Sequence, residues 1–146
     1  MATINQFNEH LRLRTMKMAM DVRQLLITVK VSSIDRPVVN QLIRSSSSVA
    51  ANYRAANCAR SDGEFLSKIS IVLEESDESK FWLEYLSAVQ VLKPIEVESV
   101  LKEVDELVRI FSSIRKKMKD RVEQARSSSP KSQVPSPKIR DLRLEA

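Results

Sequence analysis

Glycine, cysteine and histidine each occur once in the 146 residues of this chain, and each scarcity excludes a class of site. The single glycine, Gly63, excludes a glycine-rich phosphate-binding loop. The single cysteine, Cys58, excludes an internal disulfide and a cysteine-based zinc site. The single histidine, His10, leaves a di-iron carboxylate site without the ligands that it needs. We therefore expect no metal and no cofactor.

Long apolar runs and catalytic groupings are also missing. No apolar run approaches roughly 18 residues, so no membrane association is expected, and the first residues lack a signal-peptide core, which predicts a cytoplasmic location. Cys58 lies among alanines without a nearby histidine, which indicates a packing role. Glu75 and Glu78 form the best candidate for a catalytic pair, but a structural or solvent-facing role is commoner for such residues. The sequence thus predicts a protein that is not an enzyme, with carboxylate catalysis as the last-ranked alternative.

Apolar residues instead recur at helical spacing along most of the chain, which predicts an all-α protein. Helix breaks are expected near residues 31–36, 57–61 and 92–95, with the first helix over residues 5–30 and the last over 95–126. Pro37 and Pro94 follow two of these breaks, since proline suits a first helical turn. Ser61 and Glu64 match a capping box at the third start. Four helices with short connectors predict an antiparallel up-down-up-down four-helix bundle.

The apolar spacing also predicts which side chains line the core. The two central helices contain many small residues there, so we expect their backbones to pack closely. On these helices the predicted core positions are Leu42, Ser46, Val49, Tyr53 and Ala56, then Phe65, Ile69, Val72, Ser76, Ser79, Leu83 and Leu86. On the two outer helices they are Leu11, Thr15, Met18, Val22, Leu25 and Val29, then Val97, Val100, Val104, Leu107, Phe111, Ile114, Met118 and Val122.

The composition changes after Arg126. Serine and proline dominate residues 127–137, and such a segment cannot build a packed element. The sequence therefore predicts two parts: a four-helix bundle over residues 1–126 and a flexible, basic, Ser/Pro-rich tail over residues 127–146.

Positive charge is concentrated in two places. The formal net charge is +5; residues 109–126 carry seven basic against two acidic side chains, and residues 10–30 carry five against one. A basic surface of this kind suits a phosphate backbone, and the candidate nucleic-acid-binding residues are Arg12, Lys17, Arg115, Lys116, Lys117 and Lys119. Residues 61–92 carry seven acids and two bases, so the alternative is that the basic residues serve salt bridges to that segment, within or between subunits.

Four polar residues lie close to the seam of the central helices: Arg44, Asn52, Glu75 and Glu78. A charge at such a place needs a partner. An antiparallel pairing of the two helices brings Arg44 opposite Glu75, with Glu78 one turn further on. We expect a structural cluster in which Arg44 meets Glu75 or Glu78, and in which Asn52 faces residues 66–68 and satisfies nearby polar groups.

Several short motifs of the central helices stand in a characteristic order. They are Gln41-Leu42-Ile43-Arg44-Ser45, Ser48-Val49-Ala50-Ala51-Asn52-Tyr53, Ala59-Arg60-Ser61, Phe65, Lys68-Ile69-Ser70-Ile71, Glu75, Glu78, Trp82 and Leu83, with Arg14-Thr15 before them. In this order the chain resembles the 23S rRNA intervening-sequence proteins, a family of four-helix bundles. The resemblance covers residues 7–118 and leaves out the basic end and the tail. Ala55 departs from the pattern, which usually has an acidic residue there.

The resemblance implies a bacterial cytosolic protein, commonly a ring-like homopentamer, with no catalytic activity. Some members are encoded within insertions of 23S rRNA genes, and a distant relative binds nucleic acid and a reverse transcriptase. Extra apolar residues off the core also favour a homo-oligomer: Leu13, Met16, Met20, Ile27, Phe81, Tyr85, Val89 and Val108. Our first hypothesis is an oligomeric module that binds RNA or a ribonucleoprotein through basic surfaces. The alternative is a structural homo-oligomer or protein-partner adaptor without nucleic-acid binding.

Overall fold

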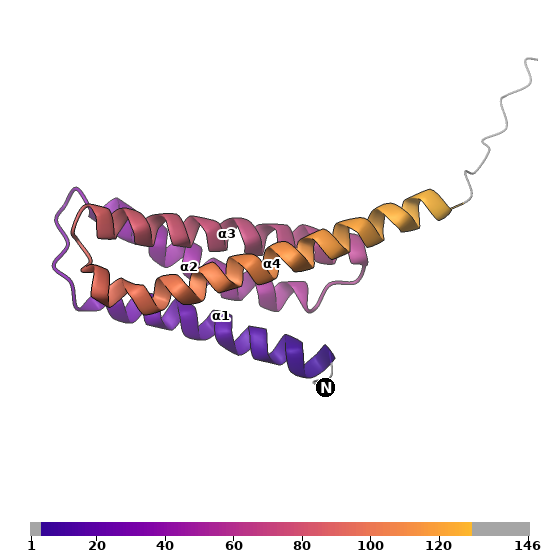
Figure 1. Cartoon of the computed structure of the whole chain (residues 1–146), viewed down its shortest axis with the longest axis horizontal. Helices are drawn as coiled ribbons and strands as arrows, with labels where there is room; N and C mark the ends of the chain where they lie inside the picture. The colour runs from indigo at the N-terminus through magenta and orange to yellow at the C-terminus, as the bar shows by residue number, and fades with distance from the viewer. Residues whose placement is uncertain (1–3, 130–146) are drawn as a thin grey trace, which may run out of the picture.

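Four helices make up the fold in the computed structural model, which describes residues 4–129. They are α1 (Ile4–Ile27), α2 (Arg36–Ala56), α3 (Asp62–Ala88) and α4 (Pro94–Ser128), and no strand occurs in residues 4–129. The predicted all-α class with four helices is confirmed. The connectors alternate between the two ends of the bundle, so that each helix runs back along the one before it (Figure 1).

The helix boundaries lie close to the predicted ones. Helix α1 ends at Ile27, three residues before the predicted residue 30, and α4 continues to Ser128, two residues past Arg126. The predicted tail therefore begins later than residue 127, and residues 130–146 lie outside the described part. None of the helices within residues 4–129 combines the length and the apolar character needed to cross a bilayer.

Side-chain caps fix two of the helix starts. The Ser61 hydroxyl accepts a hydrogen bond from the Glu64 amide (3.1 Å), as predicted for a capping box. The Glu64 carboxylate, however, accepts from the Arg60 amide (2.9 Å), one residue before the predicted partner. At the start of α4, the Glu96 carboxylate accepts from the Lys93 amide (3.2 Å). These contacts satisfy amides that an isolated helix start leaves without partners.

The core consists largely of the predicted positions. All predicted residues of α2 are buried, and so are those of α3 except Phe65, which is half-buried. On α1, Leu26, which with Ala19 was expected to widen the stripe, is buried, whereas Leu25 is half-buried because a straight helix drifts away from a strict heptad. On α4, burial ends at Phe111, and Ile114, Met118 and Val122 are half-buried. The reason is visible in Figure 1, where the C-terminal end of α4 projects beyond the other helices.

Helices α2 and α3 pack through buried serines. Ser45, Ser46, Ser76 and Ser79 are all at most 1% exposed. The Ser45 and Ser79 hydroxyl oxygens lie 3.0 Å apart, across the two helices. The Ser76 hydroxyl donates to the Val72 carbonyl (2.7 Å) within α3. Small side chains at these positions allow the close backbone approach that was predicted.

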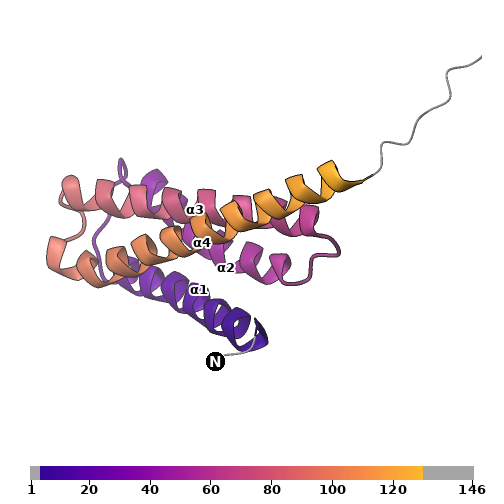
Figure 2. The same cartoon turned by 45° about the vertical axis from the view of Figure 1, so that its right-hand side comes forward.

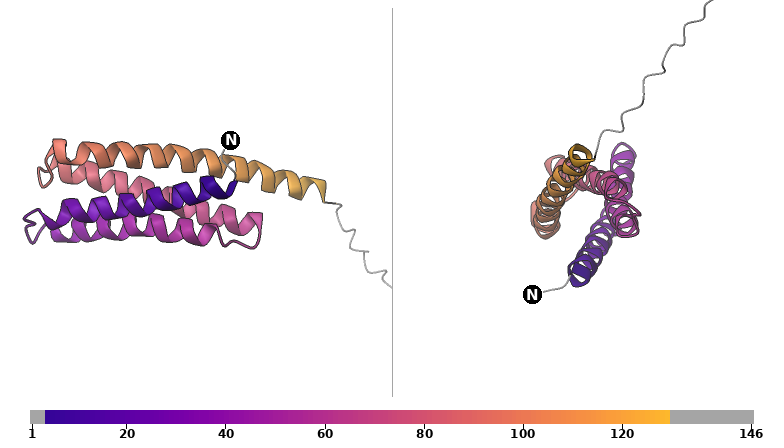
Figure 3. Two further views of the ribbon diagram at one scale, coloured as in Figure 1. Left: turned by 90° about the horizontal axis from the view of Figure 1, so that it is seen from below. Right: turned by 90° about the vertical axis from the view of Figure 1, so that its right-hand side faces the viewer.

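The opposite side of the bundle, between α1 and α4, is more open. Seen end on, the four helices form a C with α1 and α4 at its two ends (Figure 3, right). In Figure 2 the N-terminal half of α1 stands away from α4. The Arg14 guanidinium bridges this opening, since its Nε and Nη2 donate to the Glu103 carboxylate (2.8 and 2.9 Å) and Nη2 lies 3.1 Å from Glu106. This arrangement leaves room for hollows beside the bridge.

Candidate functional site

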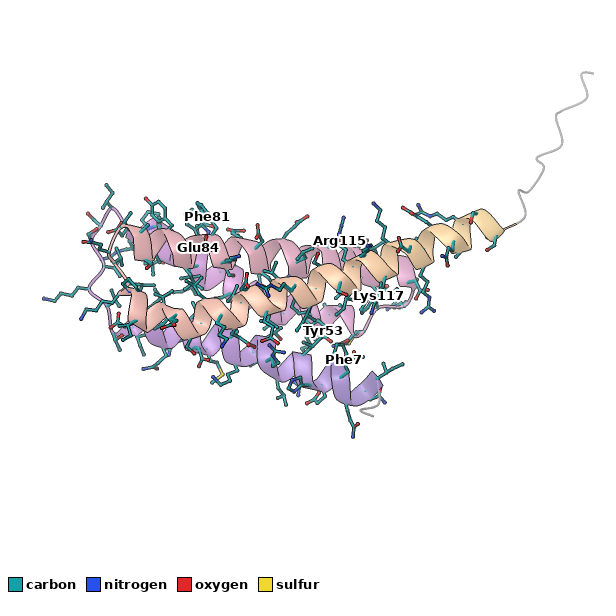
Figure 4. The ribbon with its side chains drawn as sticks, viewed as in Figure 1. Phe7, Tyr53, Phe81, Glu84, Arg115 and Lys117 are labelled. Atoms are coloured by element: carbon teal, nitrogen blue, oxygen red, sulfur yellow. The ribbon has the colours of Figure 1, made fainter. Side chains whose placement is uncertain are left out.

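The C-terminal half of α4 carries the largest group of basic side chains. Lys116, Lys117 and Lys119 are exposed, and none of them forms an ion pair within the described residues. Arg115 is also exposed, and its Nε donates to the Ser70 hydroxyl (3.1 Å) instead of a carboxylate. Arg121 alone pairs with the acidic helix α3, through Asp62 (2.9 Å). The C-terminal part of α4, where Figure 4 labels Arg115 and Lys117, therefore presents lysines that have no acidic partner within the described residues.

Arg12 and Lys17, the other two candidate residues, are placed differently. Arg12 forms two hydrogen bonds with Glu9 on α1 (2.8 and 2.6 Å), which lower the pKa of that carboxyl. Lys17 pairs with Asp21, and this hydrogen bond and, to a lesser degree, the charge of Glu103 raise the pKa of its ammonium group. Glu103 precedes Arg115 by twelve residues, or about 18 Å along α4. The structure thus does not bring Lys17 to the basic end of α4, and both residues already have acidic partners.

Two hollows lie between α1 and α4. The first, of about 510 Å³, lies around the Arg14 bridge and has mostly polar and charged residues in its wall, among them His10, Lys17 and Asp21. The second, of about 840 Å³, is mostly apolar, and we call it the α1–α4 groove. Its lining consists of Ile4, Phe7, Asn8, Tyr53, Phe65, Arg109, Ile110, Ser113, Ile114, Lys117 and Met118. In Figure 4, Phe7 and Tyr53 lie close together below α4, with Lys117 above them.

The predicted contact of Arg44 with α3 is present, but the closer partner is Glu78. Its Nη2 lies 2.8 and 3.0 Å from the Glu78 oxygens, and its Nη1 lies 3.2 Å from Glu75 Oε1. The Trp82 indole donates to the same Glu78 carboxylate (3.1 Å). These hydrogen bonds, those to Glu78 first, raise the pKa of Arg44. The Arg44 side chain is 50% exposed, so the cluster is a clamp between two helices at the surface and not a buried ion pair.

Asn52 does not join this clamp. Its amide donates to the Ser48 carbonyl (2.9 Å) and hydroxyl (3.3 Å), both one turn earlier on α2. The expected contact with nearby polar groups is therefore present as a local hydrogen bond, which is a common choice for asparagine, while the expected position opposite residues 66–68 stays a prediction. Within residues 4–129, no three His, Cys, Asp or Glu side chains stand close enough together to bind a metal ion.

Sequence reasoning missed a second link between helices, at Asp105 on α4. Its carboxylate lies 2.8 Å from Lys80 Nζ on α3 and 2.7 Å from Arg109 Nη2 on its own helix. The hydrogen bond from Lys80 is the largest reason that the pKa of Asp105 is lowered. The spacing of Asp105 and Arg109 was visible in the sequence, but the pairing with Lys80 depends on how α3 and α4 are placed.

Replacing Asp105 by Asn is expected to destabilise the fold at neutral pH and much less in acid. Because the pKa of Asp105 is lowered in the folded state, its carboxylate stabilises the fold above its unfolded pKa, ordinarily about 3.9. This contribution is lost as the pH falls through the lowered folded pKa. Thermal unfolding should show a Tm difference between parent and Asp105→Asn at about pH 7 that narrows as the pH falls below the ordinary aspartate value of about 3.9. A difference of constant size across this range would contradict the expectation.

Exposed apolar side chains form two faces outside the core. On α1, Leu13, Met16, Met20 and Ile27 follow heptad spacing on the side opposite the core, and each is at least 49% exposed. On α3, Phe81 (53% exposed) contacts the rings of Trp82 and Tyr85, with centroid distances of 4.8 and 6.2 Å. Val89 is exposed as predicted, whereas Val108 packs against the core and belongs to neither face.

Comparison with known proteins agrees with this architecture. No curated protein matches the chain. A crystal structure of a protein of unknown function from the S23 ribosomal protein family of Bacteroides thetaiotaomicron superposes with a TM-score of 0.65. The two sequences are 26% identical, and the match covers 72% of this chain and 97% of that one. The family model of the 23S rRNA-intervening sequence protein matches residues 11–113, which is most of the bundle. The chain therefore belongs to the 23S rRNA-intervening sequence protein family.

Proposed function

We propose that this chain is a non-enzymatic helical module that binds RNA through the basic end of α4. One observation carries the proposal: residues 115–126, at the C-terminal end of α4, hold six basic and two acidic side chains. Cations on such a surface attract a phosphate backbone and displace its counterions. The family name, which refers to 23S rRNA, supports RNA as the class of nucleic acid.

The competing explanation is that these cations serve the acidic helix α3. Within the described residues, the six basic side chains of this end make one ion pair with α3, between Arg121 and Asp62. The lysines at 116, 117 and 119 make none. A solvated basic surface with one structural pair is better suited to an external polyanion than to internal salt bridges.

Replacing Lys116, Lys117 and Lys119 together by Gln is expected to weaken RNA binding evenly across sequences. Each lost phosphate contact should reduce the slope of log K against log salt by about 0.7 for single-stranded RNA, or about 2 for all three. Fluorescence anisotropy with labelled RNA over a salt series measures both effects. The matched control replaces Lys30, Lys93 and Lys102, which are exposed elsewhere, and should retain the parent slope. Absence of binding by the parent at low salt, or equal losses in both triple variants, would contradict the proposal.

We further propose that the protein assembles into a homo-oligomer through its exposed apolar faces. A helix that is apolar on two opposite sides, as α1 is, has no use for the second side in an isolated bundle. The family resemblance favours a ring-like pentamer. The alternative function, a structural homo-oligomer or protein-partner adaptor without RNA binding, would use these same apolar faces.

Met20→Glu is expected to reduce the assembled mass, because it places a charge in the middle of the apolar face of α1. Asn40→Glu, which adds the same charge at an exposed polar position on α2, should leave the mass unchanged. Light scattering at micromolar concentration reads out both. A parent protein that remains a monomer of 16.7 kDa would rule out assembly.

A further inference from the structure

The α1–α4 groove opens beside the basic end of α4, and Lys117 belongs to both. This lysine is one turn after Ser113 and Ile114 on α4, and all three line the groove. The second basic residue of the lining, Arg109, is already paired with Asp105 (2.7 Å). Lys117 is therefore the cation that remains available to an anion at the mouth of the groove.

Aromatic residues from three different helices line the groove. Tyr53 of α2 is 1% exposed, and its ring packs against Phe111 with centroids 5.4 Å apart, so it forms a fixed floor. Phe65 of α3 is half-buried, and Phe7 of α1 is 46% exposed although it lies over an apolar hollow. Both Phe7 and Tyr53 line the groove, and Figure 4 labels both below α4. An aromatic side chain that leaves half of its surface in water can still accept a flat apolar partner.

Polar groups in the lining complete a pattern typical of base recognition. Asn8 offers an amide donor and acceptor, and Ser113 offers a hydroxyl. The volume of about 840 Å³ lies within the range of roughly 300–1,000 Å³ common for small-ligand sites. Proteins that bind single-stranded RNA stack unpaired bases on aromatic rings next to cations that contact the phosphates.

We propose that the α1–α4 groove holds an unpaired RNA base, stacked on Phe7 and Phe65, with the adjoining phosphate on Lys117. This inference rests on the proposed RNA-binding function and specifies its substrate as single-stranded or looped RNA in preference to duplex RNA. A base that is paired inside a duplex cannot enter the groove, whereas the lysines of α4 contact the backbone of either form. An acyl chain with an anionic head group also fits an apolar groove with one cation, but Asn8 and Ser113 favour a base with polar edges.

The test compares Phe7→Ala with Phe81→Ala, which removes the same ring from the exposed face of α3. Affinity for labelled oligo-uridine and for an RNA duplex of equal length is measured by anisotropy over a salt series. Phe7→Ala should weaken oligo-uridine binding on the order of tenfold, with an unchanged salt slope, because stacking releases no counterions. Duplex binding should not change, and Phe81→Ala should affect neither RNA at a concentration at which light scattering gives it the same mass as the parent. Phe7→Leu keeps the apolar bulk and should show the same loss, while Phe7→Trp should retain binding.

Each other outcome has a distinct meaning. If the parent binds neither RNA, the proposed function itself is wrong. If the parent binds RNA with the predicted salt dependence but Phe7→Ala and Phe81→Ala behave alike, only the nucleotide site is wrong. Tighter binding of duplex than of oligo-uridine by the parent also overturns it. Binding of cis-parinaric acid that Phe7→Ala abolishes, with no effect of that substitution on RNA, would assign the groove to an amphiphile.

Discussion

Phe111→Ala is expected to lower the free energy of unfolding by about 3–5 kcal/mol. Phe111 is fully buried and is the last fully buried residue of α4 before the helix leaves the bundle. Its ring packs against Tyr53 in a tilted arrangement with centroids 5.4 Å apart, and such pairs contribute beyond the buried area itself. Truncation removes this contact and leaves a cavity at the point where α4 is anchored.

The matched control is Phe7→Ala, which removes the same ring from a half-exposed position near the start of α1. This variant should lose about 1 kcal/mol or less. Urea unfolding of the parent and both variants at one protein concentration gives the comparison, because the proposed assembly would make stability depend on concentration. Similar losses in the two variants would show that α4 is not anchored at Phe111.

The positions of the core could be predicted because helical spacing alone determines which side chains share a face. That is why Phe111 and the serines at 76 and 79 were found from the sequence and are buried. Spacing does not show how far a helix extends beyond its neighbours. The half-burial of Met118 and Val122 therefore could not be predicted, since Met118 lines the open α1–α4 groove and Val122 lies beside Asp62 and Gly63, where α3 begins.

The candidate site was predicted only in part, for two physical reasons. The register of the antiparallel helices α2 and α3 correctly predicted that Arg44 contacts Glu75 or Glu78. Residue spacing could not predict that half of the arginine side chain remains exposed to solvent. The sequence did contain a signal that Arg12 and Lys17 pair within α1 and do not join α4, but it was overlooked. Glu9 and Asp21 stand three and four residues from them, which is the spacing of local ion pairs on a helix.

The α1–α4 groove left no trace in the sequence. It depends on the angle at which α1 departs from α4, and that angle is a property of packing between distant segments. Phe7 carried no signal because it lies before the first core position of α1, Leu11. Phe65 was assigned to the core by spacing, although it also lines the groove. Binding surfaces that several helices build together are therefore the part of this molecule that the sequence predicts least.

Ser79→Leu is expected to destabilise the fold by about 1–3 kcal/mol through overpacking. Ser79 is fully buried where α2 and α3 approach most closely through small residues, and its hydroxyl lies 3.0 Å from that of Ser45. A leucine side chain at this position cannot fit without separating the two helix backbones. The separation would also strain the clamp of Arg44 with Glu78, one residue before Ser79 on α3.

Two controls separate bulk from hydrogen bonding. Ser79→Ala removes the hydroxyl without adding volume and should cost about 1 kcal/mol, the usual contribution of one hydrogen bond. Ser47→Leu makes the same change as Ser79→Leu at an exposed position of α2 and should alter stability by about 0.5 kcal/mol or less. Urea unfolding measures all three. If Ser79→Leu were as stable as Ser79→Ala, the α2–α3 contact would have room for a large side chain, and close packing of small residues would not be what holds these two helices together.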